Sequence, residues 1–271
     1  MQHVITSDQR SFYQENGYLL ISNFLDEAET THWRTTVDFA VQKQRGKVLT
    51  GQPAGDKPNH YDNVFLQQML LSRISEEMRN LIHDEALAKI AADIAAIPGI
   101  QLWHDQALIK EPFANPTAFH RDVPFWSFDS NDAISYWIAL DDATPNNGCL
   151  HFLPGSHKSQ DYTQTNIGEN VGEIFHLFPE LTTIKPQPVP VKAGDCVFFN
   201  GMVVHGAGAN MTPDYRRAMT CGLMPKHAKF NGKRNILSEN YFRSLTIGEP
   251  LDNYEELPLL YQRPGGEQLT K

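Results

Sequence analysis

From residue 100 onward the chain is a series of short apolar segments separated by turn residues, and this pattern limits the possible folds more than any other feature. The separating stretches, such as residues 141–148, are dense in Asp, Asn, Gly and Pro. β-Branched and aromatic side chains between such turns are typical of strands. The expected strands are residues 100–109, 117–122, 134–140, 149–153, 188–191, 196–205 and 217–223. Many short strands with turns between them predict an antiparallel barrel or jelly roll.

The N-terminal part is predicted to be mainly helical and to flank that barrel. Trp33, Val37 and Val41, for example, recur at the spacing of one helix face. The expected elements are a helix capped by Ser7 that stops at Asn16, a strand at 18–21, a helix from Asp26 to about Gln44, and one or two helices at 74–96. Residues 45–63 are rich in Gly, Pro, Asn and Asp and are expected to form a long binding loop.

The 271 residues contain no internal repeat and no Pro/Gly/Ser linker, which predicts a single domain. We expect a helical part over residues 1–99, a β core over 100–225 and a C-terminal extension over 226–271 whose pattern assigns no element. The predicted fold class is therefore mainly β with flanking helices, a jelly roll of the cupin-like kind.

The overall charge and the terminal residues exclude several classes of function. A formal net charge of −9 disfavours non-specific nucleic-acid binding, which depends on basic patches. No apolar run is long enough to cross a bilayer, and the N-terminus resembles no secretory signal. The three cysteines form no CxxC pair and are expected to be buried thiols in a reducing compartment. These features predict a cytoplasmic protein with no nucleic-acid or membrane partner, and they leave the oligomeric state open.

Two of the predicted strands carry residue types that bind metal ions. Side chains alternate between the faces of a strand, so His120 and Asp122 are expected to point to one face and Arg121 to the other. Residues 196–205 end in a second histidine, His205. Two histidines and one carboxylate that leave coordination positions open form the facial triad of non-haem Fe(II) oxygenases. The alternative is a surface pair of His120 with Asp122 and a core histidine at position 205.

Arg216 and Arg217 are the candidate anchors for a co-substrate. An oxygenase of this type needs two electrons, which 2-oxoglutarate supplies, and its distal carboxylate needs a cation that binds both oxygens. Strand parity places Arg216 on the face of the small residues Ala218 and Thr220, which leave room for a ligand. Arg217 falls on the apolar face that includes Met219, which suits packing. We therefore prefer Arg216; the alternative is that both arginines lie on the surface at a strand start.

Several motifs, taken in order, resemble the phytanoyl-CoA dioxygenase family. They are residues 12–18, the triplet from His120 to Asp122, residues 137–143, 147–150, 153–157 and 205–210, and Arg216. The similarity spans about residues 12–224. Members of this family are Fe(II)- and 2-oxoglutarate-dependent oxygenases on a double-stranded β-helix. The resemblance implies that His120, Asp122 and His205 hold iron and that Arg216 binds 2-oxoglutarate.

The resemblance also implies a reaction. With Fe(II), the enzyme consumes O2 and 2-oxoglutarate, releases succinate and CO2, and hydroxylates or otherwise oxidises an unactivated C–H bond of a small-molecule substrate. The acidic balance and the lack of a basic cluster near the loops favour a free small molecule over an acyl-CoA. The rival hypothesis is a non-oxidative metal-binding barrel of the cupin type that acts as a ligand-binding protein or isomerase. Arg216 distinguishes the two hypotheses, because a non-oxidative barrel has no need of an anchor for a carboxylate.

Four more residues near the predicted site carry expectations. Trp137 is a candidate for lining the co-substrate pocket, with a plain core tryptophan as the alternative. Gln106 is a candidate for reaching the ligands of the iron or the substrate, with a satisfied strand glutamine as the alternative. Lys110 is expected to face solvent at a strand end, and His157 is expected to have a structural role in a turn.

Overall fold

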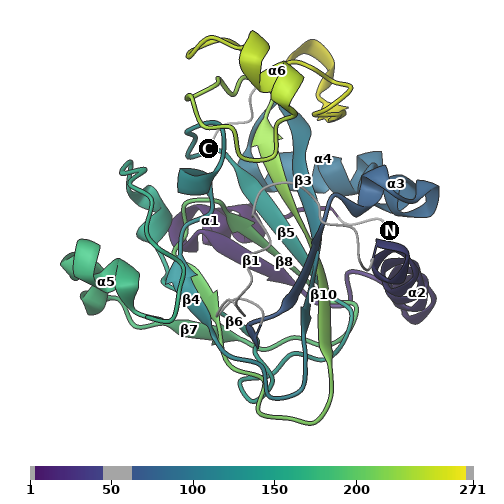
Figure 1. The fold of residues 1–271 in the computed structure, drawn as a ribbon, viewed down its shortest axis with the longest axis vertical. Helices are drawn as coiled ribbons and strands as arrows, with labels where there is room; N and C mark the ends of the chain where they lie inside the picture. Colours follow the sequence, from purple (N-terminus) through teal and green to yellow (C-terminus); the bar gives the residue numbers. More distant parts are fainter. Residues whose placement is uncertain (1–3, 45–62, 267–271) are drawn as a thin grey trace.

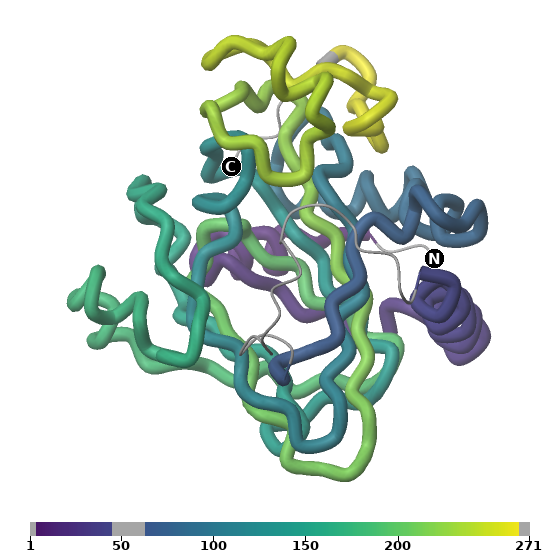
Figure 2. Tube along the Cα trace, in the orientation of Figure 1, coloured from purple at the N-terminus to yellow at the C-terminus, as the bar shows by residue number. Residues whose placement is uncertain are grey.

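Two antiparallel sheets form the body of the protein (Figures 1 and 2). The structure is a computed structural model that describes residues 4–44 and 63–266. Within these residues the larger sheet has seven strands, in the order β1-β8-β5-β10-β3-β11 with β2 beside β3, and the smaller has four, in the order β4-β9-β6-β7. The larger sheet contains β1 Tyr18–Ile21, β8 Cys196–Asn200, β5 Ile134–Ala139, β10 Arg216–Pro225, β3 Gly99–Lys110, β11 Leu259–Gln262 and β2 Leu66–Met69. The smaller contains β4 Thr117–His120, β9 His205–Ala207, β6 Leu150–Phe152 and β7 Gln187–Val189.

Helices cover the outer face of the larger sheet (Figure 1). They are α1 Ser7–Asn16, α2 Glu27–Gln44, α3 Glu76–Ile82 and α4 Glu85–Ala95. Strand β5 shows how the two faces differ: Tyr136 and Ile138 join the core that contains Trp33 of α2, whereas Trp137 and Ala139 join a second core on the inner side. Alternation along the strand produces this division. The larger sheet is therefore buried on both faces, with helices outside and the smaller sheet opposite.

The first two helices begin with capping boxes. α1 is capped by Thr6, one residue before the predicted Ser7: the Thr6 hydroxyl accepts the backbone N–H of Gln9 at 3.2 Å, and the Gln9 side chain accepts the backbone N–H of Thr6 at 3.0 Å. This reciprocal pair needs Gln9 three residues after the cap, which Ser7 does not have. Asp26 and Glu29 form the same reciprocal arrangement before α2, as the sequence predicts.

Two predicted segments are divided in the structure. Residues 74–96 form α3 and α4, because the Asp84 side chain accepts the backbone N–H of Leu87 and starts a new helix. Residues 196–205 form β8 and then, after a turn, the first residue of β9, which belongs to the other sheet.

The loops and the tail contain further short elements. Helix α5, Glu173–Leu177, lies between β6 and β7, and the tail contains α6, Glu239–Ser244, and β11, which pairs with β3. The predicted binding loop 45–63 lies outside the described residues except for Asn63. None of the described helices has the length and apolar character needed to span a membrane.

Gly17, at the end of α1, packs against the turn that carries His157. Its φ of +82° is a left-handed conformation, and an added Cβ would lie 2.5 Å from Nδ1 of His157. Nε2 of His157 donates to the carbonyl oxygen of Gln14 at 3.1 Å. The imidazole therefore holds the N-terminal helix against the turn, and only glycine leaves room for it.

Replacing Gly17 by alanine should lower the free energy of unfolding by about 2–3 kcal/mol, because the left-handed conformation costs about 1–2 kcal/mol with a side chain and the contact with His157 adds to it. Gly248→Ala is the matched control, since Gly248 has a φ of +92° with no atom within 4 Å of an added Cβ. Urea unfolding should show the smaller loss for Gly248→Ala. Equal losses would mean that the His157 contact contributes nothing.

Candidate metal centre

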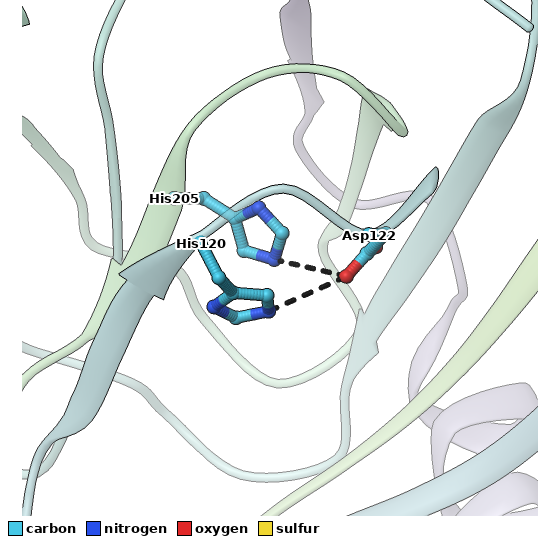
Figure 3. A group of neighbouring side chains, drawn as sticks. All are labelled: His120, Asp122 and His205. Carbon is cyan, nitrogen blue, oxygen red and sulfur yellow. Dashed lines mark ion pairs between the residues drawn. The ribbon is translucent and has the colours of Figure 1, made fainter. Parts of the chain in front are cut away.

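His120, Asp122 and His205 point toward one another at the edge of the smaller sheet (Figure 3). Nε2 of His120 lies 3.3 Å from Oδ1 of Asp122, and Nε2 of His205 lies 3.8 Å from the same oxygen. The three potential ligand atoms all lie within 4.8 Å of one another. Two imidazole nitrogens and one carboxylate oxygen gathered in this way are a donor set suited to Fe(II).

The two histidines meet because their strands pair. β4 runs antiparallel to β9, and His120 stands directly opposite His205 in that ladder. Directly opposite residues project to the same face, and the ring centroids lie 4.4 Å apart.

Asp122 reaches the site by a route that differs from the predicted one. β4 ends at His120, and Asp122 has helical angles, φ −78° and ψ −50°, at the start of a short turn over Val123–Phe125. The backbone N–H groups of Asp122 and Val123 both donate to the Gly201 carbonyl oxygen at 3.0 Å. The turn brings the carboxylate back over His120. The prediction of one continuous strand over residues 117–122 is therefore wrong at its end.

The backbone fixes which nitrogen each imidazole presents. Nδ1 of His120 lies 2.8 Å from the carbonyl oxygen of Ala118, and Nδ1 of His205 lies 3.1 Å from that of Val203. A carbonyl oxygen accepts only, so each Nδ1 carries the proton and each Nε2 keeps its lone pair. Metal-binding histidines have this arrangement, in which a backbone acceptor orients the ring. The residues therefore fit a metal ion as they stand.

Burial and nearby charges set the protonation of His205 and Asp122. Burial, assisted by His120, lowers the pKa of His205 to about 4. Burial alone would raise the pKa of Asp122, but His205, His120 and His104 together hold it below its ordinary value. At neutral pH the site therefore offers a carboxylate and a neutral His205 imidazole, the forms that bind metal ions.

The three residues line a cavity of about 930 Å³ whose walls come from both sheets. The polar lining consists mostly of amides and hydroxyls: Gln44, Gln67, Gln68, Gln106, Thr117, Gln164, Thr165, Asn166, Thr220 and Asn235. The aromatic lining consists of Phe65, Phe125, Trp126, Trp137 and Phe199. Among the described residues that line the cavity, Asp122 and Arg216 are the only aspartate, glutamate, lysine or arginine.

The two adjacent arginines lie on opposite sides of the larger sheet. Arg216 is 3% exposed and lines the cavity, and its guanidinium carbon lies 5.3 Å above the Trp137 ring. Its Nε has no hydrogen-bond partner among the described residues, and burial lowers its pKa to about 10. Arg217 instead forms ion pairs with Asp141 at 2.8 Å and Asp38 at 2.7 Å. Only Arg216 is placed to meet a ligand in the cavity.

Trp137 and Gln106 are the other two candidate site residues from the sequence. Both line the cavity, and the face of the Trp137 ring packs against the Arg216 guanidinium. The Gln106 side-chain oxygen accepts a hydrogen bond from the Gln67 amide of β2. Gln106 therefore combines the two alternatives, since it has a partner and still faces the cavity.

Sequence reasoning missed two residues on β3. His104 lines the cavity, stands edge-on to Trp126, and has an Nδ1 with no partner among the described residues. Its position two residues before Gln106 on the same strand was the signal that could have found it. Lys110 was expected to face solvent, and that prediction was wrong: its side chain is fully buried.

Arg121 holds a loop beside the site. Its side chain points away from the metal ligands, and its guanidinium donates to the Asp161 carbonyl oxygen at 3.0 Å and lies 4.5 Å above the Phe178 ring. Residues 164–167 of the same loop line the cavity. The residue between the two ligands therefore fixes one wall of the cavity.

The chain is similar to known proteins over most of its length. Residues 13–218 match the family described as phytanoyl-CoA dioxygenase (PhyH). Peroxisomal phytanoyl-CoA dioxygenase of Rattus norvegicus is 26% identical over 260 residues, which are 90% of this chain and 75% of the rat protein.

Two solved structures have the same fold. The non-haem α-ketoglutarate-dependent carbocyclase SnoK from nogalamycin biosynthesis superposes with a TM-score of 0.77 at 25% identity, covering 95% of this chain and 97% of SnoK. The epimerase SnoN, in complex with Fe3+, α-ketoglutarate (2-oxoglutarate) and nogalamycin RO, superposes with a TM-score of 0.72 at 26% identity, covering 94% of this chain and 98% of SnoN. The predicted double-stranded β-helix is confirmed.

Replacing Arg121 by leucine should loosen the loop without disturbing the metal ligands. Hydrogen exchange measured by mass spectrometry should rise about tenfold or more over residues 160–178, because a cation–π contact and a charged hydrogen bond together contribute on the order of 2 kcal/mol. Lys158→Leu, which removes an exposed cation from the same region, should leave exchange unchanged. Unchanged exchange in Arg121→Leu would show that the loop is held by other contacts.

Proposed function

The chain belongs to the phytanoyl-CoA dioxygenase family, and from this premise we propose that His120, Asp122 and His205 hold the catalytic iron with which it oxidises a C–H bond of a small molecule. The protein is an iron- and 2-oxoglutarate-dependent dioxygenase. The observation that carries the residue assignment is the convergence of two Nε2 atoms and one carboxylate oxygen within 4.8 Å of one another. Because both Nδ1 atoms donate to backbone carbonyls, the Nε2 atoms are the nitrogens that can bind the metal.

Arg216 is the proposed anchor for the distal carboxylate of 2-oxoglutarate. A buried guanidinium with an unpartnered Nε needs an anion, and its planar fork matches the two oxygens of a carboxylate. Trp137 supports the guanidinium through its ring face and keeps the fork in one orientation. Asp141 and Asp38 pair with Arg217 on the other side of the sheet, and none of the described residues forms an ion pair with Arg216.

Further contacts hold the metal-binding side chains of His205 and Asp122 in place. Bound iron and 2-oxoglutarate supply the oxidising power for the reaction of O2 with the substrate, and succinate and CO2 are the co-products. The rings of Phe199 and Phe152 lie 4.8 Å and 5.9 Å from that of His205 and restrict its rotation. The Gly201 carbonyl, which accepts two N–H groups, fixes the turn that presents Asp122.

The proposed substrate is a free, largely uncharged molecule with polar groups and an apolar face. Once Asp122 binds metal and Arg216 binds 2-oxoglutarate, the described lining offers amides, hydroxyls, imidazole and aromatic rings. Such a lining recognises hydroxyl and carbonyl groups but cannot neutralise phosphates, which bind to arginine and lysine. This lining supports a free small molecule over an acyl-CoA. Neither the comparisons nor the described residues favour the rival, a non-oxidative barrel.

Replacing Asp122 by alanine should abolish oxidation and weaken metal binding by at least about a hundredfold, because it removes a ligand and not merely a supporting contact. The measurements are succinate release from 2-oxoglutarate with Fe(II) and ascorbate, and Mn(II) titration of the apoprotein. Asp38→Asn, a carboxylate paired with Arg217 outside the cavity, is the control and should retain both. Wild-type protein that binds metal but neither binds nor consumes 2-oxoglutarate would support the non-oxidative barrel.

Arg216→Met should raise the KM for 2-oxoglutarate by about tenfold to a hundredfold, as expected when a charge-assisted hydrogen bond worth about 1.5–3 kcal/mol is lost. Arg217→Met removes the neighbouring guanidinium and should leave that KM unchanged while lowering stability, because it breaks the ion pairs to Asp141 and Asp38. Steady-state kinetics and urea unfolding separate the two effects. A raised KM in Arg217→Met together with an unchanged KM in Arg216→Met would show that Arg217 is the anchor.

A further inference from the structure

Lys110 is a buried cation directly beside the proposed co-substrate anchor. It is the last residue of β3 and stands opposite Arg216 in the ladder with β10. Directly opposite residues project from the same face of a sheet, with Cβ atoms about 5 Å apart. The Lys110 side chain is fully buried, and Arg216 is 3% exposed. The protein therefore places two buried cations at neighbouring positions on one face of the sheet, with Arg216 in the cavity lining and Lys110 outside it.

The Lys110 ammonium is held in a defined position. Nζ donates to the carbonyl oxygens of Asn115 at 2.6 Å and Val64 at 3.1 Å, and it lies 5.9 Å from the Phe65 ring. Its stem packs against Gly148, where an added Cβ would lie 2.6 Å from Cδ of Lys110. An ammonium has three donors, and the third has no partner among the described residues.

No carboxylate among the described residues forms an ion pair with Lys110 or with Arg216. The charged or titratable groups on the segments packed around Lys110 are Arg216 of β10, Glu111, which is exposed, and Cys149, whose pKa is raised by burial so that its thiol stays neutral. Burial, with a further contribution from Arg216, lowers the pKa of Lys110 to about 7. Uncompensated buried charge is costly, so this pair is poised for an anion.

We propose that Lys110 is a second cation of the co-substrate site, which strengthens the hold of Arg216 on the distal carboxylate of 2-oxoglutarate and gains a proton when that carboxylate binds. The inference rests on the proposed role of Arg216. The competing explanation is a purely structural lysine that ties the Val64 and Asn115 carbonyls together.

The proposal predicts a pH dependence of a definite sign. A nearby carboxylate favours the charged ammonium, so binding raises the pKa of Lys110 above its free value of about 7. Below that value Lys110 is already protonated and affinity for 2-oxoglutarate is greatest. Above it, binding requires proton uptake, and affinity falls by up to about tenfold per pH unit until the raised pKa is passed.

The test is calorimetric titration of the full chain loaded with redox-inactive Mn(II). 2-Oxoglutarate is compared with pyruvate, which keeps the keto acid that binds metal but lacks the distal carboxylate. Titrations at about pH 6 and about pH 8, each in two buffers of different ionisation enthalpy, report the number of protons taken up. Pyruvate corrects for titration of groups at the metal end.

Wild-type protein should take up protons with 2-oxoglutarate beyond any taken up with pyruvate. Lys110→Met, which fills the same apolar path without charge, should bind 2-oxoglutarate about tenfold more weakly at about pH 6 and lose the excess uptake. Lys110→Arg keeps its charge at every working pH and should bind tightly at both pH values without uptake. Pyruvate affinity should be the same in all three proteins.

Two results would overturn the inference in different ways. If the wild-type protein binds 2-oxoglutarate with no more proton uptake than pyruvate, or Lys110→Met binds it as the wild type does, Lys110 is structural and the proposed function stands. If the Mn(II)-loaded wild type binds no 2-oxoglutarate, the proposed function falls together with this inference. The wild-type comparison needs no variant, so poor folding of Lys110→Met does not remove the test.

Discussion

The short pairing between β4 and β9 is the interaction on which the site depends. It sets His120 opposite His205, and β9 is held on its other edge by β6. The approach of the two strands is close: a Cβ at Gly206 would lie 2.8 Å from the carbonyl oxygen of Thr117. A residue with a side chain after His205 would push the strands apart and separate the two imidazoles. The spacing of the ligands is thus set by backbone contacts and not by the metal alone.

The inner face of the larger sheet carries positive charge that no carboxylate of the described residues compensates. Arg216 and Lys110 are buried without a carboxylate partner among the described residues, while Arg217 one residue away has two. Stability alone would favour apolar residues or ion pairs at such positions. A site whose ligand is a dianion has a different requirement, because basic groups held in position in advance can bind an anion without moving. Under the proposed function, these basic groups serve to bind 2-oxoglutarate.

Much of the fold and the site could be predicted from the sequence, and the failures have identifiable causes. Strand periodicity and turn residues predicted the jelly roll, and alternation predicted which arginine faces inward, because both depend on local pattern. The turn at Asp122 was missed because the Gly201 carbonyl that shapes it is distant in the sequence. The burial of Lys110 was missed because a lysine at a strand end is usually solvated, and only the tertiary packing of Asn115, Val64 and Gly148 encloses it.

The opposite orientation of the two neighbouring arginines has a consequence for how β10 finds its partners. β10 is buried along nearly its whole length on both faces, so hydrophobicity discriminates poorly between the correct alignment and one shifted by a residue. Such a shift exchanges the faces of every side chain. It would turn Arg217 toward the inner face, away from Asp141 and Asp38, and so break both ion pairs. The ion pairs of Arg217 therefore favour the observed alignment of β10 over a shifted one, in a strand whose apolar residues discriminate poorly between the two.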